Sequence, residues 1–388
     1  SKLGKNDLST SEHMYEVLHQ TMKRADIGIN AGFAVVYECI RTITTIYPNN
    51  ILLDAAAASI SRFLSSTSNN LRYLGLNALT MIVRINPKYA TEHQRVVLEC
   101  LEDSDDTLRR KTLHLLYEMT NPANVQVITG KLLEHLARAT DPYLRRELVT
   151  RTSENAEKFA PSMRWYIRTM NKLFFLGGDL ISRDAAHNLL TLLAEGTSEA
   201  EDDRQADKED NALRLFAVRT FLRSIKKSNL PEIQIEVISW VLGEYGYLAS
   251  SSIGIGSILD QLFDLAERAP PHSEAKAWVL SAITKLICQQ RLFQAGSSAM
   301  GQGTTITLPH DLRQMVESLC SSKSLNIQQH AYELLELIKN PSIMQQVLPT
   351  DASCEEIDVD PELPFLEMFV EQSLSSGASP YEPPPRSA

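Results

Sequence analysis

The chain has 388 residues, a formal net charge of −10 and a hydrophobic fraction of 43%. This length allows several conventional domains or one elongated array of repeats. No apolar run approaches the ~20 residues that cross a bilayer. The first residues carry neither a signal pattern nor a lipidation motif, so we expect a soluble, cytoplasmic protein.

The acidic charge is concentrated in two segments. Residues 195–210 hold eight acidic and two basic side chains, and residues 351–388 hold nine acidic and one basic. These segments contribute −6 and −8 to the net charge of −10, so the rest of the chain carries +4. A dedicated nucleic-acid binder needs a concentrated cationic footprint. We therefore expect no nucleic-acid partner.

One helical template recurs along the chain. It places apolar or small residues at positions 0, +4, +7, +8 and +11, which form one face of an α-helix. Clear copies start at Leu71, Leu108, Ile181, Ala275 and Ile327, and looser copies start at Val35 and Ile233. A poor copy starts at Leu144, where Arg151 and Asn155 occupy positions that should be buried.

The spacing of the copies predicts a repeat protein. The first five starts, from residue 35 to residue 181, are 36 or 37 residues apart, and second helices are expected between them at 91–101 and 125–136. The later, longer steps include the acidic residues 195–210 and the Gly/Ser-rich residues 294–309, which we expect to be surface loops. The predicted fold is all-α, a HEAT/armadillo-like solenoid of stacked antiparallel helix pairs over residues 1–350.

No motif for catalysis or for binding a metal or cofactor stands out. Gly254 and Gly256 form a GxG pair, but Leu259 replaces the third glycine of a dinucleotide-binding loop and no strand precedes the pair. No CxxC, HxxxH or GxSxG sequence occurs. We expect no catalytic, cofactor-binding or metal-binding residues, and therefore no enzyme.

Six arginines share one position in the repeat. They fall at +1 or +2 of their templates, so stacked repeats would bring them into a row along one edge. We call this row the basic edge: Arg72, Arg109, Arg110, Arg145, Arg146 and Arg183. These side chains either pair with nearby acidic groups and solvent, or form a contact surface for an acidic protein or an anionic lipid.

Four segments resemble the trunk of the large adaptin subunits of heterotetrameric vesicle-coat adaptor complexes. They read WVLGEYGYL at 240–248, EKFAPSMRW at 157–165, LRYLGL at 71–76 and CLEDSDDTLRR at 100–110. The resemblance spans roughly residues 10–372. GGD at 177–179, LAEG at 193–196 and SCEE at 353–356 look most like the epsilon subunit of the fourth adaptor complex. Gamma adaptin is the nearest alternative.

The resemblance implies a scaffold without catalytic activity that sorts cargo in vesicle-mediated transport. It implies assembly with sigma-, mu- and beta-type chains, and peripheral attachment to trans-Golgi network and coated-vesicle membranes. Residues 1–350 would be the later part of the trunk, and residues 351–388 its acidic end and the start of a Pro/Ser-rich hinge. The Arf-type GTPase would bind an earlier part of the trunk, so no site residue is carried over. A karyopherin-like or phosphatase-scaffold HEAT-repeat protein is the alternative.

Overall fold

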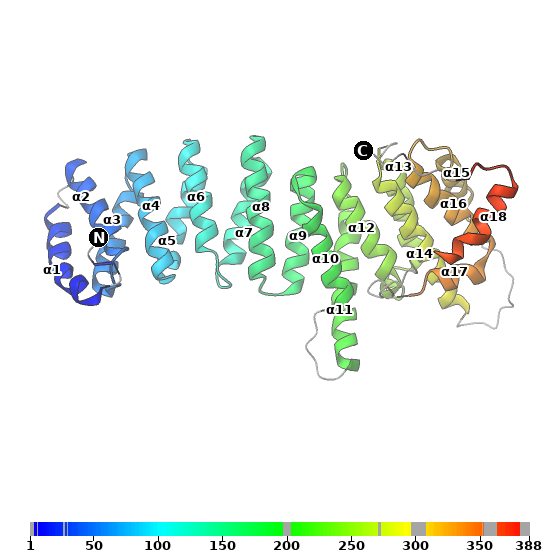
Figure 1. Ribbon diagram of the computed structural model, residues 1–388, viewed down its shortest axis with the longest axis horizontal. Helices are drawn as coiled ribbons and strands as arrows, with labels where there is room; N and C mark the ends of the chain where they lie inside the picture. Colours follow the sequence, from blue (N-terminus) through cyan, green and yellow to red (C-terminus); the bar gives the residue numbers. More distant parts are fainter. Residues whose placement is uncertain are drawn as a thin grey trace.

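The computed structural model describes residues 4–5, 7–25, 28, 30–196, 203–270, 273–295, 308–350, 352 and 363–380. Every regular element in these ranges is a helix, and the helices stand side by side along the long axis of the molecule (Figure 1). Each unit is built from two helices of neighbouring number. The predicted all-α solenoid is confirmed.

Along much of the array, even-numbered helices pack against the neighbouring even-numbered helices, and odd-numbered helices pack against the neighbouring odd-numbered ones. The even-numbered helices are α2 Asn30–Ile43, α4 Asn69–Ile85, α6 Asp106–Met119, α8 Pro142–Phe159, α10 Arg183–Glu195, α12 Glu232–Tyr245, α14 Ala275–Ala295 and α16 Leu325–Lys339. The odd-numbered helices are α1 Leu8–Ala25, α3 Asn50–Leu64, α5 Lys88–Glu99, α7 Val125–Arg138, α9 Met163–Gly177, α11 Asp203–Ser224, α13 Ile255–Arg268, α15 His310–Leu319 and α17 Pro341–Val347. Short 3-10 turns follow α5, α9 and α12.

The template marks the even-numbered helices. Seven of its eight starts lie inside these helices, and Ile181 lies two residues before α10. In α6 all five template positions are buried, with Leu115 and Leu116 completely inaccessible to solvent. The period of 36 or 37 residues therefore counts one helix pair, and the expected helices at 91–101 and 125–136 are α5 and α7.

Short polar side chains begin several of these helices. Asp105 accepts hydrogen bonds from the backbone N–H groups of Thr107 and Leu108 at the start of α6. Asp141 does the same at the start of α8, where Pro142 occupies the first turn. Such caps satisfy donors that have no partner inside the helix. The starts of these capped helices are thus encoded locally.

Several template positions are less buried than predicted: Val35 and Asn188 are exposed, and Leu71, Leu192 and Leu335 are only half-buried. Val35 is 42% exposed, because the buried face of α2 runs through Val36 and Ile40, one residue further along. Leu335 is only half-buried, whereas Leu334 is completely buried. The buried face of α2 is shifted from the template, and that of α16 is narrower than the template. The prediction that all five of these positions are buried in the core is therefore wrong.

The predicted acidic loop is shorter than residues 195–210. Residues 203–210 form the first two turns of α11, which projects beyond its neighbours in Figure 1. Arg204, Gln205, Ala206 and Glu209 are good helix formers, and Gln205 Nε2 donates to Glu209 Oε1 at 2.8 Å, one turn on. Acidic side chains also favour the start of a helix. Residues 197–202 lie outside the described residues.

The Gly/Ser-rich loop begins later than predicted. Residues 294 and 295 are the last residues of α14, while residues 308 and 309 precede α15. Residues 296–307 lie outside the described part of the chain, so the predicted loop stays a prediction there. Near the C-terminus, η4 Pro364–Leu366 leads into α18 Glu367–Ser375, which has no buried residue. The division of the chain at residue 350 also stays a prediction.

Candidate functional site

The basic edge divides into two sets of arginines. All six lie on α4, α6, α8 or α10, which follow one another along the array (Figure 1). The side chains at template position +1 are partly buried, whereas those at +2 are exposed. The +1 set is Arg72, Arg109 and Arg145, and the +2 set is Arg110, Arg146 and Arg183.

Arg72 and Arg109 both bind the loop between α5 and α6. Arg72 forms an ion pair with Asp103, whose side chain is 7% exposed. Arg109 donates from Nη1 to the backbone carbonyl of Asp103 at 2.8 Å and pairs with Asp106. Acidic groups close to the template thus hold these two arginines, as one of the two interpretations of the edge expects.

Arg145 joins the ends of two helices. Its Nη1 donates to the carbonyls of Leu136 at 3.0 Å and Ala139 at 3.1 Å, where α7 ends. Its Nη2 donates to the carbonyl of Leu176 at 2.7 Å, in the last turn of α9. The last carbonyls of a helix lack intrahelical donors and carry partial negative charge. The Arg145 guanidinium therefore supplies hydrogen-bond donors to the C-terminal ends of two helices, α7 and α9.

The sequence did not reveal that two arginines outside the template act in the same way. Arg214 donates from Nε to the carbonyl of Leu193 at 3.0 Å, at the end of α10. Arg268 donates from Nη2 to the carbonyl of Ile225 at 2.8 Å, just after α11. No local pattern marks these residues, because the helix-end carbonyls that they reach, those of Leu193, Ala194 and Ile225, lie 20 or more residues away. Arginine side chains that donate to carbonyl groups at the ends of helices thus recur along this solenoid.

Replacing Arg145 by alanine is expected to lower the free energy of unfolding by about 1–2 kcal/mol, because three carbonyls lose a charged donor. Arg146→Ala is the matched control, since Arg146 lies next to it and is exposed. Its effect should stay within about 0.5 kcal/mol. Urea unfolding followed by circular dichroism measures both. Equal losses for the two variants would contradict the closing role of Arg145.

The +2 arginines form the exposed part of the edge. The Arg110 guanidinium lies 5.1 Å from the centre of the Tyr143 ring, where it makes a cation–π contact. Arg183 is 83% exposed, and its Nη2 lies 3.7 Å from Glu236 Oε1. A groove of about 500 Å³ opens beside Arg110 between α4 and α6. It is lined by Tyr73, Asp106, Thr107, Arg110, Lys111 and His114.

The described residues hold no group of three or more histidine, cysteine, aspartate or glutamate side chains arranged for a metal ion. Cys39, Cys100 and Cys288 are buried, and Cys320 is half-buried; Cys354 lies outside the described residues. None of the described helices combines the length and the apolar character that a membrane span requires.

Comparison with known proteins gives consistent matches. The family model "Adaptin N terminal region" matches residues 1–342. AP-4 complex subunit epsilon of Arabidopsis thaliana is 40% identical over 98% of this chain and 39% of its own length. AP-4 complex subunit epsilon-1 of Homo sapiens is 39% identical over 98% of this chain and 32% of its own.

A second group of relatives is more distant. AP-1 complex subunit gamma-1 of Arabidopsis thaliana is 29% identical over 73% of this chain. A homology model of the full-length AP-3 complex in an intermediate open conformation superposes with a TM-score of 0.53 at 13% identity, covering 88% of this chain and 64% of that chain. The latter likeness supports the fold alone. The chain spans between 32% and 39% of the length of the two AP-4 epsilon relatives. It belongs to the adaptin family and is most similar to the AP-4 epsilon type.

Proposed function

We propose that the protein is a non-enzymatic scaffold subunit of a vesicle-coat adaptor complex. The observation that carries this proposal is the 39–40% identity to AP-4 epsilon subunits over 98% of the chain. Identity to AP-1 gamma subunits is 25–29%. A stack of helix pairs presents extended surfaces on which several chains can assemble. The protein would then act through geometry rather than through a reaction.

The proposed partners are the sigma-, mu- and beta-type chains of the same complex. The proposed location is cytoplasmic, with peripheral attachment through the complex to trans-Golgi network and coated-vesicle membranes. Names of the relatives place those proteins in the AP-4 and AP-1 complexes. We extend this role to the present chain because the similarity covers nearly all of it.

The exposed arginines of the basic edge are proposed as a contact surface for an acidic segment of one of these partner chains. Arg110, Arg146 and Arg183 are exposed and lie on three different helices, so an extended acidic partner could meet all of them. The +1 arginines would support this surface from beneath by fixing the loops between the helices.

Co-purification tests the scaffold role. The full-length protein, tagged and isolated from cytosol under gentle conditions, is expected to bring down sigma-, mu- and beta-type chains in near-equal amounts, as judged by mass spectrometry. Recovery of a Ran-type GTPase or of a phosphatase catalytic subunit, without adaptor chains, would instead favour the karyopherin-like or phosphatase-scaffold alternative.

A further inference from the structure

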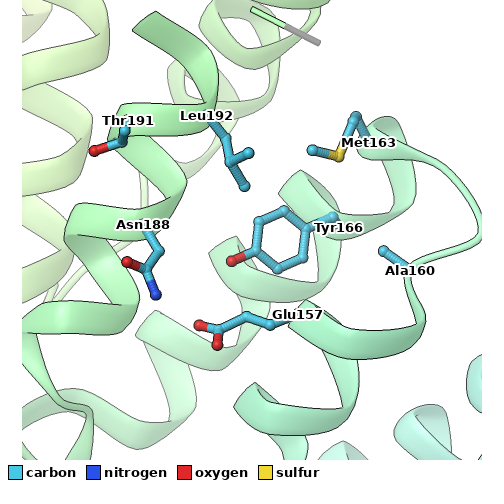
Figure 2. Close-up of a pocket in the computed structure, with 7 residues that line it drawn as sticks. All are labelled: Glu157, Ala160, Met163, Tyr166, Asn188, Thr191 and Leu192. Atoms are coloured by element: carbon cyan, nitrogen blue, oxygen red, sulfur yellow. The ribbon is translucent and has the colours of Figure 1, made fainter. Parts of the chain in front are cut away.

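A pocket of about 320 Å³ opens between α8, α9 and α10 (Figure 2). It lies next to the helix where the repeat template fails. There Asn155 is 1% exposed, and neither amide atom of its side chain has a hydrogen-bond partner in the described structure. The even-numbered helices on either side pack elsewhere, α8 against α6 and α10 against α12. The pocket therefore lies where the packing between successive even-numbered helices, α8 and α10, is interrupted.

The pocket has an apolar side and a polar side. Met163 and Leu192 lie above the ring of Tyr166 in Figure 2, and Ala160 lies beside it. The Tyr166 hydroxyl points toward the space between the side chains of Asn188 and Glu157, so three polar groups converge there. The remaining lining residue, Thr191, directs its hydroxyl away from them. Apolar walls with a few convergent polar groups are typical of binding sites.

Tyr166 is the unusual member of this group. Its side chain is 2% exposed, yet the hydroxyl has no hydrogen-bond partner among the described residues. Leaving a buried polar group without a hydrogen-bond partner is destabilising, so phenylalanine at this position would be expected to give equal or higher stability. Retention of the hydroxyl despite this cost points to a role in binding. Burial and the nearby charge of Glu157 raise the pKa of Tyr166, so the phenol stays neutral. A neutral hydroxyl oxygen can accept a hydrogen bond from a cation.

The charge at the mouth is negative. Glu157 is exposed, and no lysine, arginine or histidine of the described residues forms an ion pair with it. Asn188, also exposed, brings an amide oxygen that can accept a further hydrogen bond. Both side chains lie on the surface and can rotate to admit a guest to the shielded hydroxyl. Three acceptors, one of them anionic, match a group that carries several donors and a positive charge.

We propose that this pocket binds a lysine or arginine side chain of a protein partner. The aliphatic part of the guest would lie against Met163 and Leu192, and its charged head would donate to Glu157, Tyr166 and Asn188. Basic side chains combine an apolar stem with a charged head in this manner. A pocket of about 320 Å³ lies at the small end of the range for drug-sized ligands, which favours one inserted side chain.

This inference adds a specific contact to the proposed scaffold role, and it rests on that role only in taking the guest to be part of a protein. The test is made with N-acetyl-arginine methylamide and the 388-residue chain carrying ¹³C-methyl methionine. We expect a saturable shift of the Met163 methyl resonance, with a Kd on the order of millimolar. The signal is assigned from its absence in Met163→Leu.

Matched probes and variants decide the chemistry of the guest. N-acetyl-citrulline methylamide has nearly the same shape without the charge and should bind at least fivefold more weakly. Glu157→Gln should weaken arginine binding about tenfold, the order expected for loss of a partly desolvated charge pair. Thr191→Val is the control and should leave the Kd unchanged, because the Thr191 hydroxyl points away from the polar groups.

Tyr166→Phe separates binding from folding. It should weaken arginine binding severalfold while leaving the unfolding midpoint equal or higher, because the hydroxyl it removes has no internal partner. The proposal is overturned if N-acetyl-norleucine methylamide binds as well as the arginine probe. It is also overturned if Glu157→Gln changes nothing, or if the arginine probe produces no saturable shift. None of these results would affect the co-purification of adaptor chains, so the two proposals can fail separately.

Discussion

Replacing Leu116 by alanine is expected to lower the free energy of unfolding by about 2–5 kcal/mol, the range found when a large buried side chain leaves a cavity. Leu116 lies in the middle of α6 and is completely inaccessible to solvent. α6 packs against both α4 and α8, so the cavity would weaken two contacts of the array. A unit of a solenoid is held mainly by such contacts with its neighbours.

Arg110→Ala is the matched control, six residues earlier on the same helix. The Arg110 side chain is exposed and contacts the ring of Tyr143, so its loss should cost no more than about 1 kcal/mol. Denaturant unfolding compares the two variants. If they lose equal stability, the buried and exposed faces of α6 are assigned wrongly. Leu335→Ala should fall between them, because Leu335 is half-buried.

Arg110→Ala also tests the basic edge as a contact surface. If Arg110 binds an acidic partner chain, the variant should lose no more than the small amount of stability given above but recover less of that chain in the co-purification. Arg146→Ala and Arg183→Ala should act in the same direction, and a triple variant should act more strongly. Undiminished recovery with the triple variant would show that these arginines are only solvated charge.

The sequence was sufficient to predict the repeat because the apolar period of each even-numbered helix is local. Leu108, Leu115 and Leu116 mark the core face of α6 without knowledge of any other helix. Pattern alone could not fix the exact rotation of a helix. Val35 and Val36 are equally apolar, and contacts with neighbouring helices decide that Val36 is buried. The same reasoning applies to Leu334 and Leu335.

Charge was a poorer guide to local structure than apolar spacing. Eight acidic residues in 195–210 suggested a solvated loop, but residues 203–210 are helical because their side chains favour a helix and support one another one turn apart. Here the residue types were more informative than their summed charge. Intrinsic helix propensity would have predicted this part of α11.

The candidate sites depended on contacts that no sequence pattern records. Position +1 of the template identified Arg145, but its three carbonyl partners lie 6, 9 and 31 residues away. Only the fold shows that it closes two helices. The poor template copy at Leu144 did give a signal: Asn155, one of its two polar residues at template positions, is buried without hydrogen-bond partners in α8, the helix that also contributes Glu157 to the pocket with Tyr166. A failure of the repeat pattern thus pointed to a helix that borders the pocket.

Gly243→Ala is expected to destabilise the protein by about 1–3 kcal/mol through overpacking. Gly243 lies near the end of α12, where a Cβ atom would come within 2.8 Å of the Cα atom of Ala282 in α14. A backbone atom cannot yield as a flexible side chain can, so the two helices would have to separate. Gly130→Ala in α7 is the matched control, because a Cβ atom there meets no other atom within 4 Å.

The two glycine substitutions should change stability in opposite directions. Alanine is the better helix former by about 0.5–1 kcal/mol, so Gly130→Ala should stabilise, whereas the clash at Gly243 should outweigh the same gain. Because stacked repeats interact only with their neighbours, the damage should be local. Amide hydrogen exchange in Gly243→Ala should speed up in α12 and α14 and stay unchanged in α4 and α6. Equal effects of the two substitutions would mean that α12 and α14 are not in close backbone contact at Ala282.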